Sequence, residues 1–131
     1  MNDLKIERDE RYSLITIEKE KADDDLFEEL FSQVVGEMEV GRLNFIFNFE
    51  NIKDFNHSLY LKLNHINNVI LKEGGILVIA GFNAVTADLF NDLDIVSTKT
   101  ISEACDYIIM EEIERQFMDV DEDELDDDME D

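Results

Sequence analysis

Two apolar segments with a helical pattern between them constrain the fold of this chain more than any other feature. Residues 43–49 alternate in character, and this period of two predicts a strand with one heavily buried face. Residues 76–80 form a continuous apolar run, which is typical of a strand covered on both faces. Between them, one apolar stripe predicts a helix over residues 58–73. This order predicts a right-handed crossover that makes the two strands parallel neighbours in the middle of a sheet.

The remaining segments complete a mixed sheet with helical cover. Residues 4–8 and 12–18 predict two strands joined by a polar turn, and therefore a hairpin. Residues 22–38 carry a wide apolar stripe and predict a helix, with three aspartates at its start rather than at a metal site. Further elements are predicted at residues 84–93 (a short helix), 95–97 (a brief strand) and from residue 100 or 101 onward (a final helix). The prediction is an α/β fold, with a mixed β-sheet of about four to five strands covered by about four α-helices.

The chain is strongly acidic, with 34 Asp and Glu against 11 Lys and Arg and a formal charge of -23. This charge repels phosphate backbones and anionic lipid headgroups, so nucleic acid is disfavoured as a direct ligand. The N-terminus has no apolar core of the signal-peptide type, and no stretch has the length to span a bilayer. We therefore expect a cytoplasmic protein without membrane insertion.

Part of the acidity is concentrated in residues 119–131, DVDEDELDDDMED, which hold ten carboxylates and no basic side chain. We expect this tail to be disordered, because it has few apolar groups to offset the entropy of ordering. A solubilising extension is the favoured role of this tail, ahead of weak cation binding or docking to a basic surface. The spacing of its acidic residues lacks the glycine and terminal glutamate of a calcium loop, so no metal site is predicted there. The predicted organisation is one domain over residues 1–118 and a disordered acidic tail over residues 119–131.

Few residues offer chemistry of their own. Cys105 is the only cysteine and lies on a helical apolar stripe, which favours a buried structural thiol. His57 and His65 are the only histidines, and no phosphate loop, dinucleotide fingerprint or zinc-protease motif occurs. The sequence predicts no metal site and no cofactor. A metal-dependent enzyme that uses Asp54 and tail carboxylates is the weakest of the functional hypotheses.

The junction between the strand at residues 43–49 and the following helix is the candidate functional site. Asn56, His57 and Ser58 are expected at the helix start, and either Asn56 or Ser58 fits the N-cap. Both choices put the Ser58 hydroxyl in the first turn, where unpaired backbone N–H groups and the helix dipole favour a phosphate. For an arbitrary serine in this setting, capping alone is the commoner role.

The segments FIFNFENIKDFNHSLYLKL and LKEGGILVIAGFNAVTADLF carry a resemblance to a known family. They resemble the STAS domain, the fold shared by bacterial anti-sigma-factor antagonists and the cytoplasmic portions of sulfate transporters, and the resemblance covers about residues 4–112. Family members typically open the helix with Asp-Ser-Ser-Gly-Leu and place Gly-Gly before the next strand. Aligned without gaps, Asn56 takes the aspartate position, His57 the first serine and Ser58 the second. Leu59 takes the glycine position.

The resemblance implies a non-enzymatic, protein-binding regulatory module. The resemblance implies a protein like an anti-sigma-factor antagonist, which binds a serine-kinase anti-sigma factor and is released from it when Ser58 is phosphorylated. The expected partner-binding residues are Asp54, Asn56, His57, Ser58, Tyr60 and Lys62. The alternative is a STAS scaffold or transporter-associated module that binds a protein without phosphorylation. The identity of the partner and the oligomeric state stay open.

Overall fold

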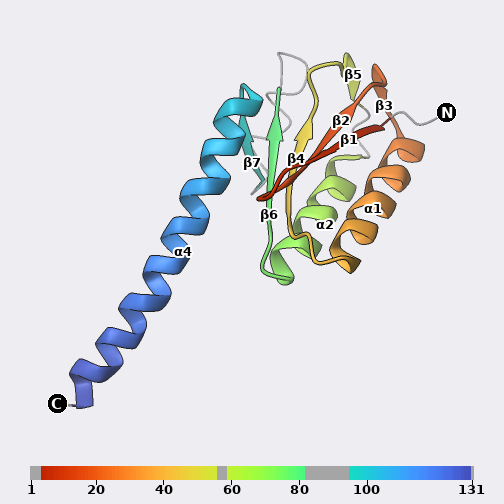
Figure 1. The fold of residues 1–131 in the computed structure, drawn as a ribbon. Helices are drawn as coiled ribbons and strands as arrows, with labels where there is room; N and C mark the ends of the chain where they lie inside the picture. Colours follow the sequence, from red (N-terminus) through yellow and green to blue (C-terminus); the bar gives the residue numbers. More distant parts are fainter. Residues whose placement is uncertain (1–3, 56–58, 82–94, 131) are drawn as a thin grey trace.

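In the computed structural model, a five-stranded mixed sheet forms the centre of the molecule, with strand order β1-β2-β4-β6-β7 (Figure 1). The structure describes the backbone of residues 4–55, 59–81 and 95–130, and the side chains of residues 4–54, 61–81 and 95–116. The strands are β1 (Leu4–Arg8), β2 (Ser13–Ile17), β4 (Asn44–Asn48), β6 (Ile76–Ala80) and β7 (Val96–Thr98). β1 pairs with β2 in antiparallel orientation, and the other neighbours are parallel.

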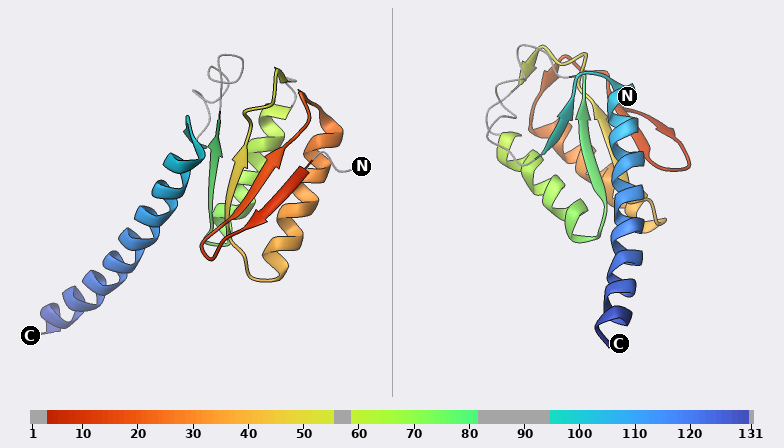
Figure 2. Two further views of the ribbon diagram at one scale, coloured as in Figure 1. Left: turned by 45° about the horizontal axis from the view of Figure 1, so that its top comes forward. Right: turned by 90° about the vertical axis from the view of Figure 1, so that its left-hand side faces the viewer.

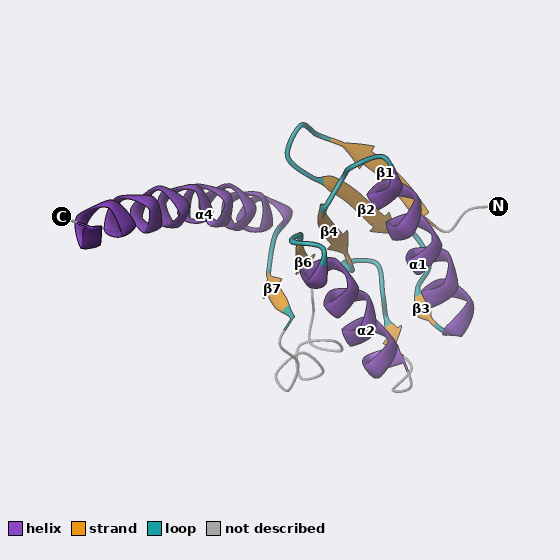
Figure 3. Ribbon diagram, turned by 90° about the horizontal axis from the view of Figure 1, so that it is seen from below, coloured by secondary structure: helices purple, strands orange, loops and turns teal. Residues whose placement is uncertain are grey.

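Helices cover both faces of the sheet. α1 (Asp24–Glu39) and α2 (Leu59–Lys72) lie side by side on one face, and α4 (Ile101–Glu130) packs on the other (Figures 1 and 3). Phe45 and Phe47 of β4 belong to the apolar core beneath α1 and α2. Ile46 and Ala104 belong to a second core beneath α4. The fold is therefore a sheet between two helical layers, as an α/β domain requires.

The predicted parallel pairing of the two strands that flank the crossover helix is confirmed. β4 and β6 are parallel neighbours, with Phe45 opposite Leu77 and Phe47 opposite Ile79. The predicted hairpin is also confirmed, since Leu4 of β1 lies opposite Ile17 of β2. The α/β fold class follows from these pairings, with five strands in the main sheet.

The burial of β4 differs from the prediction of one heavily buried face. Phe45, Phe47 and the intervening Ile46 are each 0 % exposed, and Asn48 is 3 % exposed. The second face is buried because α4, which is distant in the sequence, packs against it. A central parallel strand is covered on both sides, so alternation of apolar and polar residues along it does not indicate that one face is exposed to solvent.

Other boundaries differ by small shifts. α1 begins at Asp24, and the carboxylate of its N-cap, Asp23, accepts a hydrogen bond from the Leu26 N–H at 3.1 Å, which agrees with aspartates at the helix start. β7 lies one residue later than predicted. Two short strands that were not predicted, β3 (Lys21–Ala22) and β5 (Asp54–Phe55), pair in parallel as a separate sheet. The helix predicted over residues 84–93 lies outside the described residues.

α4 continues well beyond the sheet. Ala104 and Ile108 are fully buried, and the later turns project away from the sheet (Figures 1 and 2). The backbone of residues 119–130 is helical here, whereas the sequence predicts a disordered tail. The helix continues because residues 101–131 contain no proline or glycine to end it. The disorder and the domain boundary at residue 118 stay predictions, to be tested by truncation.

Candidate functional site

The candidate site lies at the carboxyl ends of the parallel strands, where β4 leads into the loop before α2. Asn48 ends β4, and its Oδ1 accepts a hydrogen bond from the Glu50 N–H at 3.1 Å. Gly81 follows β6 with φ of +75°, and a Cβ at this position would lie 2.6 Å from Asn48 Oδ1. Because any larger residue would be strained and would collide with this amide, position 81 favours glycine.

The loop that leaves β4 is anchored to the sheet. The Phe49 N–H donates to the Ala80 carbonyl at 2.8 Å, and the Ile52 N–H donates to the Phe49 carbonyl at 3.0 Å. The side chains of Phe49 and Ile52 are 1 % and 0 % exposed. The loop therefore continues the core beyond the end of β4.

A second set of hydrogen bonds joins this loop to the segment after β2. The backbone N–H groups of Lys53 and Asp54 donate to the Glu20 carbonyl at 2.7 and 3.1 Å. The Asn51 side-chain amide donates to the Ile17 carbonyl at 3.3 Å. Pairing of β3 with β5 extends these contacts to residue 55. The backbone that leads toward α2 is thus held from two directions.

α1 borders the first turns of α2. Lys62 Nζ lies 3.0 Å from Asp24 Oδ1 and 5.5 Å from the centre of the Phe27 ring. The Lys62 and Asp24 side chains are 41 % and 60 % exposed, so their ion pair contributes at most about 1 kcal/mol to stability. The contact therefore orients the Lys62 ammonium beside α1 without binding it tightly.

The structure describes part of the predicted binding surface. Asp54 is an exposed residue of β5, Lys62 lies near the start of α2, and Tyr60 contributes its backbone to α2. Asn56, His57 and Ser58 lie outside the described residues. Their roles, and that of the Tyr60 side chain, stay predictions.

No protein family profile and no curated protein matches the sequence, but solved structures resemble the fold. The anti-sigma factor antagonist SpoIIAA in its unphosphorylated form gives a TM-score of 0.65 at 16 % identity, over 80 % of this chain and 96 % of that one. The Bacillus SpoIIAA in its phosphorylated form gives 0.61 at 15 % identity, over 80 % and 98 %. A serine-to-glutamate variant of Moorella thermoacetica RsbS gives 0.68 at 14 % identity, over 87 % and 99 %.

The chain has the STAS fold. The murine anion transporter Slc26a9 also resembles it, with a TM-score of 0.61 at 12 % identity, over 76 % of this chain and 18 % of the transporter. At such identities the likeness concerns the fold alone.

Within this STAS fold, α1 and the strand ends contribute residues that the sequence analysis did not include in the site. Asn48 carried a signal, because an asparagine that ends an apolar strand is typical of a side chain that accepts a nearby backbone hydrogen bond. Asp24 and Phe27 carried no local signal, because their contact with Lys62 joins two helices distant in the sequence. Only the packing of α1 beside α2 brings these residues together.

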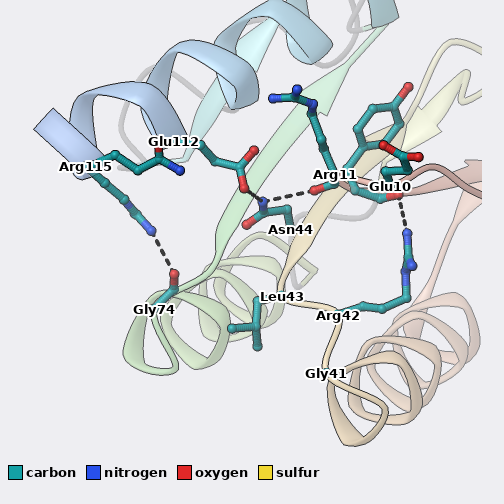
Figure 4. Close-up of a pocket in the computed structure, with 11 residues that line it drawn as sticks. Glu10, Arg11, Gly41, Arg42, Leu43, Asn44, Gly74, Glu112 and Arg115 are labelled. Atoms are coloured by element: carbon teal, nitrogen blue, oxygen red, sulfur yellow. Dashed lines mark hydrogen bonds between the residues drawn. The ribbon is translucent and has the colours of Figure 1, made fainter.

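A hollow of about 400 Å³ lies at the opposite end of the STAS fold, between the β1–β2 turn and α4 (Figure 4). The Asn44 amide donates to the Arg11 carbonyl at 3.0 Å and to the Glu112 carboxylate at 3.2 Å. Arg115 Nη1 donates to the Gly74 carbonyl at 2.7 Å. The bonds of Glu112 and Arg115 attach α4 to β4 and to the turn after α2 at this end of the fold.

Cys105 is half-buried rather than buried, and a hydrogen bond joins its Sγ to Tyr12 Oη at 3.1 Å. This hydrogen bond, together with burial, raises the pKa of Tyr12 to about 12. The described residues hold no group of three or more His, Cys, Asp and Glu side chains that could bind a metal ion. Within the same described ranges, no helix combines the length and apolar character needed to cross a bilayer.

Proposed function

We propose that this protein is a non-enzymatic, protein-binding regulatory module that acts as an anti-sigma-factor antagonist in the cytoplasm. It binds a serine-kinase anti-sigma factor and is released when Ser58 is phosphorylated. The observation that supports this most directly is the anchored loop at the strand ends, which precedes α2. In the sequence, Ser58 comes immediately before Leu59, the first residue of that helix. SpoIIAA, which has a similar fold, has been solved in unphosphorylated and phosphorylated forms.

The proposed switch is electrostatic. A phosphate on Ser58 adds a charge of about -1.5 to -2 next to a helix N-terminus, whose free N–H groups favour an anion. Lys62 follows Ser58 by four residues, a spacing that places two helical side chains on one face. Its exposed ion pair with Asp24 is weak enough to be exchanged for the phosphate. The added charge and volume would oppose close contact with the partner.

The test uses the purified protein, ATP and a serine kinase encoded next to its gene. We expect mass spectrometry to locate the phosphate on Ser58. Calorimetry should show that the affinity for the kinase falls by about tenfold or more after modification. Ser58→Ala should retain binding and lose the modification. Ser102→Ala, which changes an exposed serine on α4, is the matched control and should change neither. Phosphate at another residue, or binding unchanged by phosphorylation, would contradict the assignment.

A second candidate function is an unphosphorylated STAS scaffold or transporter-associated binding module. Two residues favour it, because Asn56 and Leu59 stand where phosphorylated members of the resembled family typically have aspartate and glycine. The likeness to part of Slc26a9 is compatible with this role. It predicts that substitution of Asn56, His57 or Tyr60 abolishes partner binding although no phosphate ever appears on Ser58.

A further inference from the structure

The outer surface of α1 carries a groove that the proposed function does not use. A hollow of about 570 Å³ follows this helix from Phe27 to Glu39. A second hollow, of about 410 Å³, lies between α1 and the edge strand β1. Glu28 and Ser32 line both hollows, so the two adjoin. In the views of Figures 1 and 3, α1 forms one side of the molecule, with α2 on its inner flank.

Aromatic side chains form part of the groove floor. The rings of Phe27 and Phe31 are stacked with centres 6.0 Å apart, and His65 of α2 lies 5.8 Å from the Phe31 ring. Both phenylalanines pack on the core but are only partly buried. Apolar surface left partly exposed inside a concave groove is characteristic of an interaction site.

Gly36 lines the same groove and has no structural explanation within the described residues. It lies inside α1, where glycine is unfavourable relative to alanine, and its φ is not positive. A Cβ at this position would have no atom within 4 Å. The α1 backbone is therefore open to close approach by another chain.

The charge of the groove selects the kind of partner. The residues that line the two hollows include Asp25, Glu28, Glu29 and Glu39, and they include no lysine or arginine. A second copy of this chain, with its formal charge of -23, would be repelled. Residues 27–39 span about 18 Å along the helix axis, the length of roughly three turns of an opposing helix. The surface is thus complementary to a basic helix with one apolar face.

We propose that the α1 groove is a docking surface for a basic amphipathic helix of a partner protein. The apolar face of that helix packs over Phe31 and Gly36, and its Lys or Arg side chains contact the carboxylates along the rim. This surface goes beyond the proposed switch, because it shares only Phe27 with the candidate site and its test does not involve Ser58.

The test titrates the full chain with a synthetic peptide of about 18 residues, with leucines at helical spacing and lysines elsewhere. A peptide of the same composition with the leucines scattered is the control for charge alone. We expect the amphipathic peptide to shift the backbone NMR signals of Phe27, Phe31 and Gly36, and to bind more tightly than the scattered one. Equal binding by both peptides, or shifts spread over the acidic surface without these residues, would overturn the proposal.

Matched variants separate the groove from general acidity. Gly36→Leu fills the groove without changing charge, and should weaken binding of the amphipathic peptide by about tenfold or more. Ser102→Leu adds the same side chain at an exposed position of α4 and should leave binding unchanged.

A second pair of variants tests the charge of the groove. Glu28→Gln combined with Glu39→Gln should weaken binding more than Asp106→Asn combined with Glu114→Gln, which removes equal charge from α4. If the α1 variant and its α4 control changed peptide affinity equally in either comparison, docking at α1 would be refuted.

Discussion

A buried carboxylate fastens α1 to the hairpin, and its removal is the most informative test of the fold. Glu37 is 5 % exposed, and its two carboxylate oxygens accept hydrogen bonds from Arg8 Nε and Nη2, both at 2.8 Å. Ser13 Oγ donates to the same carboxylate at 2.9 Å, and Arg42 Nε donates to Ser13 Oγ at 2.7 Å. One carboxylate therefore joins α1, β1, β2 and the segment before β4.

Glu37→Gln keeps the shape of the side chain and removes its charge. The new amide directs one NH₂ group toward guanidinium donors, so at least one charge-assisted hydrogen bond is lost. Hydrogen bonds to charged groups contribute about 1.5–3 kcal/mol, and breaking a buried ion pair costs about 3–5 kcal/mol. Because the Arg8 side chain is 55 % exposed and returns to water, the lower end applies. We expect a loss of about 2–3 kcal/mol and a fall in Tm of roughly 10 °C.

The assay is urea unfolding followed by circular dichroism, with thermal melts as a second measurement. Glu28→Gln is the matched control, because Glu28 is an exposed residue of the same helix. It should change the free energy of unfolding by no more than about 0.5 kcal/mol. If Glu37→Gln changed it as little, the network would make no net contribution to stability and the argument would fail.

The pH dependence gives an independent check. Hydrogen bonds from Arg8 are the largest cause that lowers the pKa of Glu37 below its ordinary value of about 4.5, while burial opposes the shift. A carboxyl with a lowered folded-state pKa stabilises the protein fully above its unfolded-state pKa, and this contribution is lost as the pH falls through the folded-state value. The difference between wild type and Glu37→Gln should therefore be constant near neutral pH and decrease below about pH 4.5. A difference that persisted unchanged in acid would contradict this assignment.

One further substitution tests the contact between Gly81 and Asn48, and one deletion tests the tail. Gly81→Ala should lower the free energy of unfolding by about 1–3 kcal/mol, because the new side chain would be held at positive φ against Asn48. A thermal melt measures this loss, and an unchanged Tm would show that the Asn48 side chain can move aside. Deletion of residues 119–131 should leave the fold intact with a Tm change of only a few degrees, the equivalent of roughly 1 kcal/mol, and a much larger fall would show that the tail packs.

The elements predicted best are those whose patterns are local. The β4–α2–β6 crossover follows from one change of period along a continuous segment, and the structure has both strands where the pattern places them. The burial of Ile46 could not be predicted in the same way, because its cover comes from α4, far along the chain. β3 and β5 are two residues each, too short for a periodic pattern, and they form because hydrogen bonds to Glu20 bring them together.

The candidate site shows the same division. Its position after β4 was predictable, because a polar turn between a strand and a helix start is a local signal. The anchoring of Ile52 and the pairing of Lys62 with Asp24 were not, because each depends on the three-dimensional packing of segments with no relation in sequence. Sequence patterns therefore indicate where a site begins, and long-range contacts decide which side chains surround it.

The arrangement of these contacts bears on how a phosphate at Ser58 would act. Hydrogen bonds tie residues 49–54 of the loop to Ala80, Ile17 and Glu20, and the side chains of Phe49 and Ile52 are buried in the core. We expect a charge added after this anchored segment to leave these bonds in place, and to act on the surface of α2 and on the exposed ion pair of Lys62 with Asp24. Modification would then change partner affinity while leaving the melting temperature nearly constant. A large change in stability on phosphorylation would instead require the loop and its core contacts to rearrange.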